Sequence, residues 1–489
     1  MHSDFTNVAV VGIDAIRSLR IDRGTIASVE RDESPTFTTP DNKTLTDLPP
    51  RTVVKVVLRP AEGSNINVEL WLPDENKWNG RLLGLGNGGA AGRINPGGLA
   101  GAAAGGWAAV TTDMGTAPNA DSGIGNHEVW KDFGFRATHL MTVIAKQVIA
   151  AFYGRGPERS YFSGGSTGGQ QAMSLAQRYP DDYDGIVAHI AAHCRTPLHA
   201  YFLWNEQILQ KCPFSEDQMK PVIAAGNEYM AAREVPAVAG KFVSDPRCTP
   251  ADIEAVVALA MANDPSLTPD HADALRNLFD GPHHAITGER IFDGIPIGTS
   301  WHDARGNLYL FKWVFGAEKN LLDINFGDDI DTYTAALGPY LNAENPDLSA
   351  FAARGGKLLM LMGSADACVP YHTSIDYYEQ AADRLGGLET VQSFFKLYII
   401  PGRGHGGGPG LTQLPDMMEA VRAWREDGAA PDAITARRVT DGVTELEMPI
   451  YPYPQKTGWD AAAAKYVPID GPRGDVGRVA ERFLPREAE

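Results

Sequence analysis

The chain has 489 residues, more than one simple domain needs, and a formal net charge of −18. This charge disfavours nucleic-acid partners because phosphates are repelled, and no run of about 18 apolar residues is present that would cross a membrane. Four cysteines are too few for a disulfide scaffold, and residues 1–14 lack the basic stretch of a secretion signal, so a cytoplasmic protein is expected.

Apolar runs with strand character recur along the chain. Residues 1–55 are expected to form a small β-rich N-terminal region, and core strands are predicted at 52–58, 66–72, 81–85, 107–112, 159–163, 185–190, 357–362 and 394–400. Residues 135–153 have helical periodicity between two of these runs. The alternation predicts an α/β fold with a largely parallel sheet covered on both faces, formed by residues 56–194 and 351–489.

One predicted strand runs into a glycine-rich loop that ends at Gly89. Gly84, Gly86 and Gly89 match the G-x-G-x-x-G of a dinucleotide-binding turn, and Asp113 lies near the position of a ribose-binding acid. Such a turn must open directly into a helix, and residues 93–99 are expected to be too rich in proline and glycine to form one. A nucleotide-dependent oxidoreductase is therefore the weaker interpretation of this loop.

A G-x-S-x-G segment centred on Ser166 lies between a strand-like run and a run with helical spacing. Small residues on both sides allow a serine to occupy a strained turn with its hydroxyl facing a cleft, which predicts Ser166 as a nucleophile. The backbone N–H groups of Gly89 and Thr167 are then expected to form the oxyanion hole, as in α/β-hydrolases. The alternative interpretation is a plain glycine-rich turn.

From 195 to 350 the strand pattern stops and helix-start signals replace it. Residues 215–218 have the form of a capping box, and Thr249 and Thr268 each precede a proline at an expected first helical position. The sequence therefore predicts a mainly helical lid domain over 195–350.

Aromatic residues concentrate in this helical segment. They are Tyr201, Phe202, Trp204, Trp301, Tyr309, Phe311, Trp313 and Phe315. Most are expected to pack in a core, and Trp301, Trp313 and Phe315 are expected to line the substrate pocket. Cys212 and Cys248 flank the first helical stretch and are expected to be unbridged thiols, with a disulfide left open if the protein is exported.

Two further strand ends carry residues that a reactive serine needs. Serine is activated by a histidine that a carboxylate orients, in the chain order Ser, Asp, His. Asp366 follows the run at 357–362 and His405 follows the run at 394–400, so both are expected at the cleft where parallel strands end. Together the positions indicate a Ser166–His405–Asp366 triad, although a turn-forming aspartate and a surface-loop histidine are the simpler alternatives for each residue alone.

A series of motifs follows the same order along most of residues 50–455. They are 66–73 with 78–80, the loop 86–89, 111–115, 133–136, 160–169, 178–185, 363–370 and His405. Together these motifs resemble the tannase/feruloyl esterase family of serine hydrolases, which also includes mono(hydroxyethyl) terephthalate hydrolase. The resemblance implies an α/β-hydrolase core, a large lid inserted before the acid strand, and hydrolysis of esters of aromatic acids.

The chain departs from that family at two features. Members usually carry one cysteine before the nucleophile and one after the histidine, joined in a disulfide, whereas Gly165 and Gly406 stand at these positions here. The tether between the catalytic loops is therefore expected to be absent. The family lid also commonly carries a calcium loop, but the corresponding stretch at 224–245 lacks the spaced aspartates, so no metal or other cofactor is expected.

The sequence thus predicts a serine hydrolase that cleaves small esters of benzoic- or cinnamic-type acids through an acyl-enzyme. The alternatives are a generic esterase acting on non-aromatic esters, the nucleotide-dependent oxidoreductase, and a non-catalytic binding protein that kept the fold. The expected partner is a small-molecule ester, with neither nucleic acid nor membrane. An apolar lid surface would support a homodimer.

Overall fold

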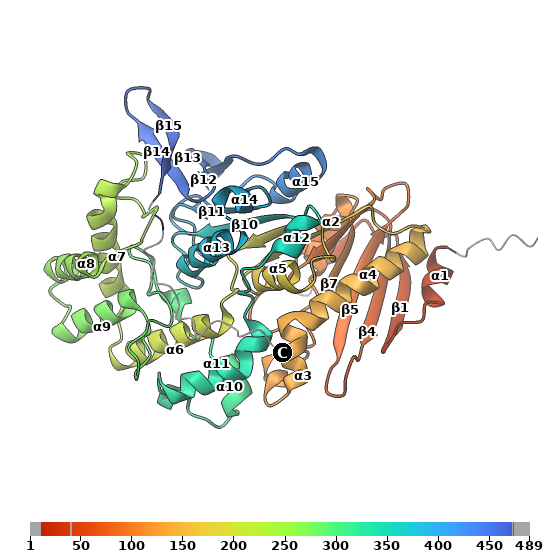
Figure 1. Cartoon of the computed structure of the whole chain (residues 1–489), viewed down its shortest axis with the longest axis horizontal. Coiled ribbons are helices and arrows are strands. Elements are labelled where there is room, and N and C mark those ends of the chain that lie inside the picture. Colours follow the sequence, from red (N-terminus) through yellow and green to blue (C-terminus); the bar gives the residue numbers. More distant parts are fainter. Residues whose placement is uncertain (1–10, 40–41, 472, 474–489) are drawn as a thin grey trace, which may run out of the picture.

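A nine-stranded sheet forms the centre of the computed structural model, which describes residues 11–39, 42–471 and 473 (Figure 1). Its strand order is β1-β4-β5-β7-β6-β8-β9-β10-β11. The strands are β1 (Gly24–Asp32), β4 (Arg51–Leu58), β5 (Ile66–Pro73), β6 (Arg81–Leu85), β7 (Ala108–Thr112), β8 (Arg159–Gly165), β9 (Gly185–His189), β10 (Lys357–Gly363) and β11 (Phe395–Ile400). Pairings from β1 to β7 are antiparallel and those from β7 to β11 are parallel. The predicted α/β sheet is confirmed.

Side chains of the central strands alternate between two hydrophobic cores, one on each face of the sheet. In β10, Leu358, Met360 and Met362 enter one core, whereas Leu359 and Leu361 enter the other. The helices of the first face are α4 (Ala137–Tyr153), α5 (Thr167–Arg178) and α13 (His372–Leu385), and those of the second face are α2 (Pro96–Ala104) and α15 (Met417–Asp427). Burial on both faces explains why these strands are continuous apolar runs in the sequence.

The helix α2 contradicts the expectation that residues 93–99 form no helix. It begins at Pro96 because the Asn95 side chain accepts a hydrogen bond from the Gly98 N–H, and a proline at the first helical position has no N–H to satisfy. Asp113 is held inside the core, where its carboxylate accepts hydrogen bonds from the backbone N–H groups of Asn67 and Gly115. A carboxylate engaged in this way does not support the dinucleotide interpretation.

A helical insertion separates β9 from β10, and its first helices gather on the side of the molecule away from β1 (Figure 1, green). Its helices are α6 (Arg195–Lys211), α7 (Glu216–Met230), α8 (Pro250–Asn263), α9 (Pro269–Asp280), α10 (Tyr309–Phe315), α11 (Asp328–Leu341) and α12 (Ser349–Ala353). The predicted starts are confirmed, because Ser215, Thr249 and Thr268 each form a reciprocal capping box with the third residue of the helix.

Both ends of the chain add β-structure. The strand β1 pairs with β4, so the N-terminal region extends the central sheet. The C-terminal segment forms two hairpins that the sequence did not predict, β12 (Ile434–Thr440) with β13 (Val443–Ile450) and β14 (Gln455–Asp460) with β15 (Lys465–Asp470). The remaining α-helices and strands of the described residues are α1 (Ile13–Arg17), β2 (Phe37–Thr38), β3 (Thr44–Leu45), α3 (His127–Lys131) and α14 (Leu388–Gln392). In the described part of the chain, no helix is long and apolar enough to cross a membrane.

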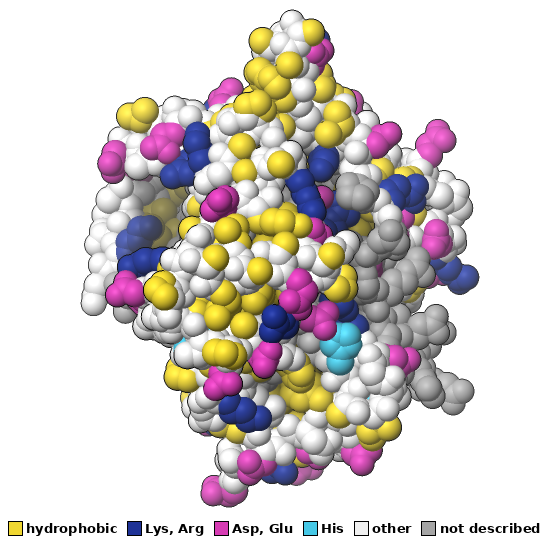
Figure 2. Space-filling view, turned by 90° about the vertical axis from the view of Figure 1, so that its left-hand side faces the viewer, with side chains coloured by type: hydrophobic (Ala, Val, Ile, Leu, Met, Phe, Trp, Pro, Cys, Tyr) yellow, Lys and Arg dark blue, Asp and Glu magenta, His cyan; other side chains and the backbone are white. Residues whose placement is uncertain are grey.

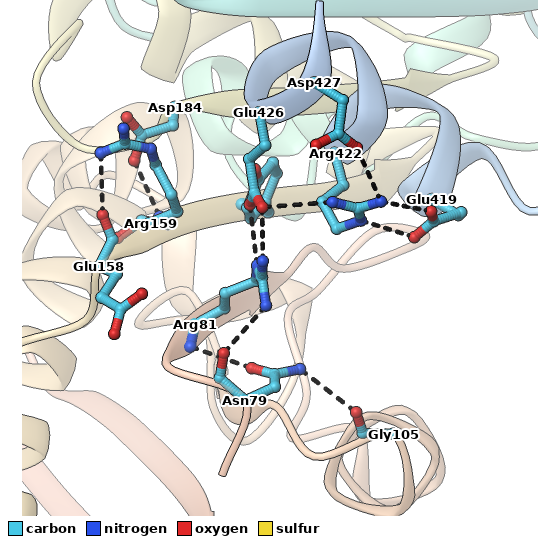
Figure 3. A network of polar contacts seen from close by, with 12 residues as sticks. Asn79, Arg81, Gly105, Glu158, Arg159, Asp184, Glu419, Arg422, Glu426 and Asp427 are labelled. Carbon is cyan, nitrogen blue, oxygen red and sulfur yellow. Dashed lines mark hydrogen bonds and ion pairs between the residues drawn. The ribbon is translucent and has the colours of Figure 1, made fainter. Parts of the chain in front are cut away.

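A polar network anchors α15 where the parallel strands begin (Figure 3). Arg81, the first residue of β6, donates from Nε to Glu426 Oε1 over 2.8 Å, and the Tyr161 hydroxyl of β8 donates to the same oxygen over 2.6 Å. Arg422 also contacts this carboxylate. The hydrogen bond from Arg81 lowers the pKa of Glu426 to about 2, so the carboxylate stays ionised at neutral pH. The site described below lies at the opposite, C-terminal ends of these parallel strands.

Figure 2 shows the face that carries the helical insertion and the hairpin of β14 with β15, and charged and hydrophobic side chains are mixed on its surface. Acidic, basic and hydrophobic side chains alternate over it, and hydrophobic ones gather towards the hairpin at the top. On that hairpin Trp459 is 39% exposed and Ile469 is 41% exposed. Two exposed hydrophobic side chains do not identify a partner, so the homodimer stays a prediction.

Candidate active site

Ser166 occupies the sharp turn between β8 and α5. Its backbone has φ 57° and ψ −114°, a conformation that non-glycine residues rarely adopt. The turn depends on close packing around it, since a Cβ on Gly164 would lie 2.4 Å from the carbonyl oxygen of Gly168. The Ser166 N–H donates to the carbonyl of His189 on the neighbouring strand over 3.0 Å. The strand–turn–helix that the sequence predicts around this serine is present.

His405 lies between Ser166 and Asp366, within hydrogen-bonding distance of both. His405 Nε2 is 3.1 Å from Ser166 Oγ, and His405 Nδ1 is 2.9 Å from Asp366 Oδ2. The Asp366 side chain is fully buried, and its other oxygen accepts the N–H groups of Cys368 and Val369. A carboxylate held from both sides fixes the plane and tautomer of the imidazole, which is the arrangement that nucleophilic serine chemistry requires.

His405 is under two opposing influences on its pKa. Burial disfavours the imidazolium and lowers the pKa, but the hydrogen bond and the charge of Asp366 outweigh burial and raise the pKa above its ordinary range. A general base must be unprotonated to accept the serine proton. Activity that uses His405 is therefore expected to rise with pH through this raised pKa.

Gly89 and Thr167, the two residues expected at the oxyanion hole, are linked directly. The Thr167 hydroxyl donates to the carbonyl oxygen of Gly89 over 2.7 Å, which ties the glycine loop after β6 to the first residue of α5. Gly89 has φ 80°, a backbone conformation that glycine adopts at little cost. The N–H groups in the first turn of a helix have no intrahelical acceptor, so they are available to an anion.

A cavity of about 290 Å³ opens beside Ser166. Its lining comprises Gly89, Ser166, Thr167, Ala192, Arg195, Leu198, His199, Phe202, Asn307, Tyr309, Cys368, Val369 and His405. Core and insertion both contribute, the core through the proposed catalytic groups and the insertion through α6 and the start of α10. Four of the five residues expected at the triad and the oxyanion hole thus line one cavity, and the fifth, Asp366, is buried next to it and contacts His405.

The three aromatic residues expected to line the pocket lie elsewhere. Trp301 packs edge-on against Phe214 with ring centroids 5.3 Å apart, and Trp313 donates to the carbonyl of Ala120 and is 1% exposed. Phe315 is half-buried against the same hydrophobic cluster as Trp313. None of the three lines the cavity, because their rings are used in hydrophobic packing within the insertion or between the insertion and the core. The pocket aromatics are instead Phe202 and Tyr309.

Four of the lining residues that the sequence analysis did not assign follow one pattern. Arg195, Leu198, His199 and Phe202 have the spacing i, i+3, i+4 and i+7, so they share one face of α6. The helix starts shortly after β9, at the same end of the sheet as Ser166. In the sequence, these residues could have been identified by their helical spacing directly after a buried parallel strand.

All four cysteines of the chain are free thiols. Gly165 and Gly406 stand where the family disulfide would join the catalytic loops, so the structure agrees with a chain that lacks this tether. Cys212 and Cys248 are not joined in this structure. The hydrogen bonds of His405 to Asp366 and Ser166 hold the loops together instead.

Within the described residues, one buried group of possible metal ligands was found: His193, Cys194 and Glu344, whose ligand atoms all lie within 4.8 Å of one another. Cys194 Sγ is 3.3 Å from His193 Nδ1. Burial lowers the pKa of His193 to about 4 and raises the pKa of Glu344 to about 8, so both are uncharged at neutral pH. Metal binding needs a deprotonated carboxylate and thiol, which this environment disfavours.

A larger cavity of about 480 Å³ lies between the insertion and the two C-terminal hairpins. Neither Ser166 nor His405 lines it. Asp245, at the end of the stretch compared with a calcium loop, lines this cavity. Its carboxylate accepts hydrogen bonds from Arg247 and from the Tyr371 hydroxyl. These neighbours and the charge of Lys456 lower the pKa of Asp245 to about 2 despite its burial.

The comparisons with known proteins agree with this geometry. A family model described as tannase and feruloyl esterase matches residues 52–324 and 320–467. The chain belongs to the tannase and feruloyl esterase family. It is a carboxylic ester hydrolase. An uncharacterized esterase of Xanthomonas campestris is 28% identical over 94% of this chain and 91% of its own length. A probable feruloyl esterase of Arthroderma benhamiae is 30% identical over 78% of this chain and 77% of its own.

Two solved structures share the fold of this tannase/feruloyl esterase family protein. Feruloyl esterase B from Aspergillus oryzae superposes with a TM-score of 0.79 at 23% identity, covering 93% of this chain and 99% of its own. Tannin acyl hydrolase from Aspergillus niger gives a TM-score of 0.73 at 17% identity, covering 97% and 96%. The α/β-hydrolase type of the core is thereby established.

Proposed function

We propose that this esterase hydrolyses esters of small aromatic acids through an acyl-enzyme on Ser166. The hydrogen-bonded series Ser166–His405–Asp366 beside the cavity is the observation that carries the proposal. His405 takes the hydroxyl proton as Ser166 attacks the ester carbonyl, and Asp366 stabilises the imidazolium that forms. The N–H groups of Gly89 and Thr167 stabilise the oxyanion, and His405 then returns the proton to the departing alcohol.

Water completes the reaction by a second addition. His405 accepts a proton from water as the water oxygen attacks the acyl carbonyl, and the tetrahedral intermediate then expels the Ser166 oxygen, which regains a proton. Free acid leaves the cavity. Each half of the reaction uses the same base and the same oxyanion donors, so one arrangement of groups serves both.

Two features support a small aromatic acid as the acyl group. A cavity of about 290 Å³ is at the small end of ligand sites, which suits a single ring better than a polymer chain. Phe202 and Tyr309 supply aromatic walls, and stacking on such walls contributes about 0.5–1.5 kcal/mol beyond area burial. Relatives named feruloyl esterase and tannin acyl hydrolase support the same class.

The helical insertion, residues 195–350, acts in this proposal as the lid that closes the cavity. Its contribution of Arg195, His199, Phe202 and Tyr309 to the lining supports that role. We also propose that the enzyme works in the cytoplasm on a small imported ester, which its four free thiols support.

The test is a panel of methyl esters with acids of matched size. Methyl benzoate is compared with methyl cyclohexanecarboxylate, and methyl cinnamate with methyl 3-cyclohexylpropanoate, in kcat/KM. The aromatic esters are expected to be favoured by up to about tenfold, the rate equivalent of one aromatic contact. Equal or higher kcat/KM on the aliphatic esters would leave a generic serine esterase.

A further inference from the structure

Arg195 is a buried cation in the wall of the catalytic cavity. It is the first residue of α6, is 4% exposed, and lines the same cavity as Ser166 and His405. Its Nη1 donates to the Thr167 hydroxyl over 3.1 Å and its Nη2 donates to the Tyr309 hydroxyl. The guanidinium carbon lies 5.4 Å from the centre of the Phe133 ring. Every one of these neighbours is uncharged.

No carboxylate balances this charge among the residues that the structure describes. The cavity lining contains neither aspartate nor glutamate. Asp366, the acid of the catalytic series, already accepts from His405 on one oxygen and from two backbone N–H groups on the other. Burying an unpaired charge is costly, and buried charges are normally paired.

A second buried arginine illustrates the usual arrangement. Arg51 has a fully buried side chain, and its Nη2 forms an ion pair with Asp32. Arg195 has hydroxyl and ring neighbours where Arg51 has a carboxylate. The difference indicates that the counter-ion of Arg195 arrives with a ligand of the cavity.

The guanidinium also has unused hydrogen-bond donors. An arginine carries five N–H groups. Thr167 and Tyr309 each receive one, and Nε has no acceptor within the structure. The remaining donors match a planar anion such as a carboxylate, which arginine binds with two parallel hydrogen bonds. His199 adds no charge of its own, because burial keeps its pKa well below the ordinary value.

We propose that Arg195 is an anion subsite of the catalytic cavity and that the preferred ester carries a carboxylate. This inference rests on the proposed function and narrows it from esters of small aromatic acids to charged ones. The carboxylate lies either on the acid part or on the alcohol part of the ester. In both cases the Arg195 guanidinium would bind a carboxylate group.

A positioning role is the competing account. The bond from Arg195 to Thr167 continues to the carbonyl of Gly89, so Arg195 also steadies the proposed oxyanion hole. Loss of positioning alone would lower kcat for every ester by the same factor. Loss of an anion subsite lowers kcat/KM selectively for charged esters, mainly through KM.

The experiment measures kcat/KM for two pairs of esters that differ only in charge. The first pair is monomethyl terephthalate and methyl 4-carbamoylbenzoate, with the charge on the acid part. The second pair is benzoyl glycolate and benzoyl glycolamide, with the charge on the alcohol part. The anion of at least one pair is expected to be preferred about tenfold to a hundredfold, the range of a charge-assisted hydrogen bond.

The variants separate the two accounts. Arg195→Gln is expected to abolish the preference for the anion, and Arg195→Lys to keep part of it. Arg276→Gln, which removes an exposed charge on α9, is the control and should keep the wild-type ratio. No preference for the anion in either pair, an unchanged ratio in Arg195→Gln, or an equal loss on all four esters would overturn the inference.

Inhibition gives a readout that is independent of turnover on charged esters. Benzoate is expected to inhibit hydrolysis of methyl benzoate at least about tenfold more strongly than benzamide, and Arg195→Gln should lose this difference, whereas a difference due to the proposed oxyanion hole alone would remain in the variant. Equal inhibition would overturn the anion subsite. Hydrolysis of the neutral ester in the same assay shows that the proposed function holds even when the subsite fails, whereas absence of all ester hydrolysis contradicts the proposed function itself.

Discussion

The sheet and the helical insertion build one cavity by different means. Ser166, Asp366 and His405 each follow the end of a strand, β8, β10 or β11, so parallel pairing brings them together. The insertion contributes its walls through one face of α6 and through Tyr309, whose places depend on how helices pack. Changes in the sheet loops should therefore abolish turnover, whereas changes in the insertion should alter the choice of substrate.

The largest expected effect comes from the sheet side. Ser166→Ala removes the proposed nucleophile and is expected to lower kcat on an aryl ester by about 10⁴-fold or more, with His405→Ala comparable, because the proposed triad acts as a unit. Steady-state kinetics of both variants is the measurement. Turnover of Ser166→Ala near the wild-type rate would contradict the mechanism.

A smaller effect is expected from the walls of the insertion. Phe202→Leu should lower the ratio of kcat/KM for aromatic over aliphatic esters by up to about tenfold, since one stacking surface is lost while bulk is retained. Trp301→Phe is the matched control, because Trp301 packs against Phe214 and lies outside the cavity lining. It should lower Tm and leave the ratio unchanged. The reverse result would place the acyl pocket at Trp301.

The buried Glu344 side chain is expected to make the stability of the protein depend on pH. Burial raises its pKa from 4.5 to about 8, so the folded chain keeps a proton that the unfolded chain releases. Stability is therefore expected to fall as pH rises from about 4.5 to 8. In Glu344→Gln the decline of Tm over this range should be shallower by a few degrees. The exposed Glu318→Gln should keep the wild-type slope, and an unchanged slope in Glu344→Gln would contradict the shift.

No effect is expected from reduction. With Gly165 and Gly406 in place of the family disulfide and four free thiols, kcat/KM in dithiothreitol should equal the value without it. Initial rates after incubation at neutral pH provide the measurement. Inactivation would reveal a bridge that holds the catalytic loops, with Cys212 and Cys248 the first pair to examine.

The same contrast explains what could be predicted from the sequence. Strand ends are local features, because apolar runs and glycines mark them, so Ser166, Asp366 and His405 could be located without coordinates. The walls of the cavity depend on which side of each helix faces the sheet. Trp313 and Phe202 are both large aromatics in the insertion, and only packing decides that Trp313 contacts Gly123 and Phe133 while Phe202 faces Ser166's cavity.

The helix α2 and the C-terminal hairpins were missed for another reason. Propensity counted the prolines and glycines of residues 93–99 against a helix, yet the Asn95 cap and burial of Leu99 and Ala100 outweigh that preference. The hairpin strands β14 and β15 have mixed polarity, since they pair with each other at the surface. A local cap with burial therefore decided the helix, and strand pairing at the surface decided the hairpin.

The most direct test of the account is the site of covalent labelling by a fluorophosphonate. This reagent phosphonylates a serine that a neighbouring base has activated. Intact mass should increase by one adduct, peptide mapping should place it on Ser166, and Ser166→Ala and His405→Ala should remain unlabelled. Labelling of another residue, or none on the active enzyme, would contradict Ser166 as the nucleophile.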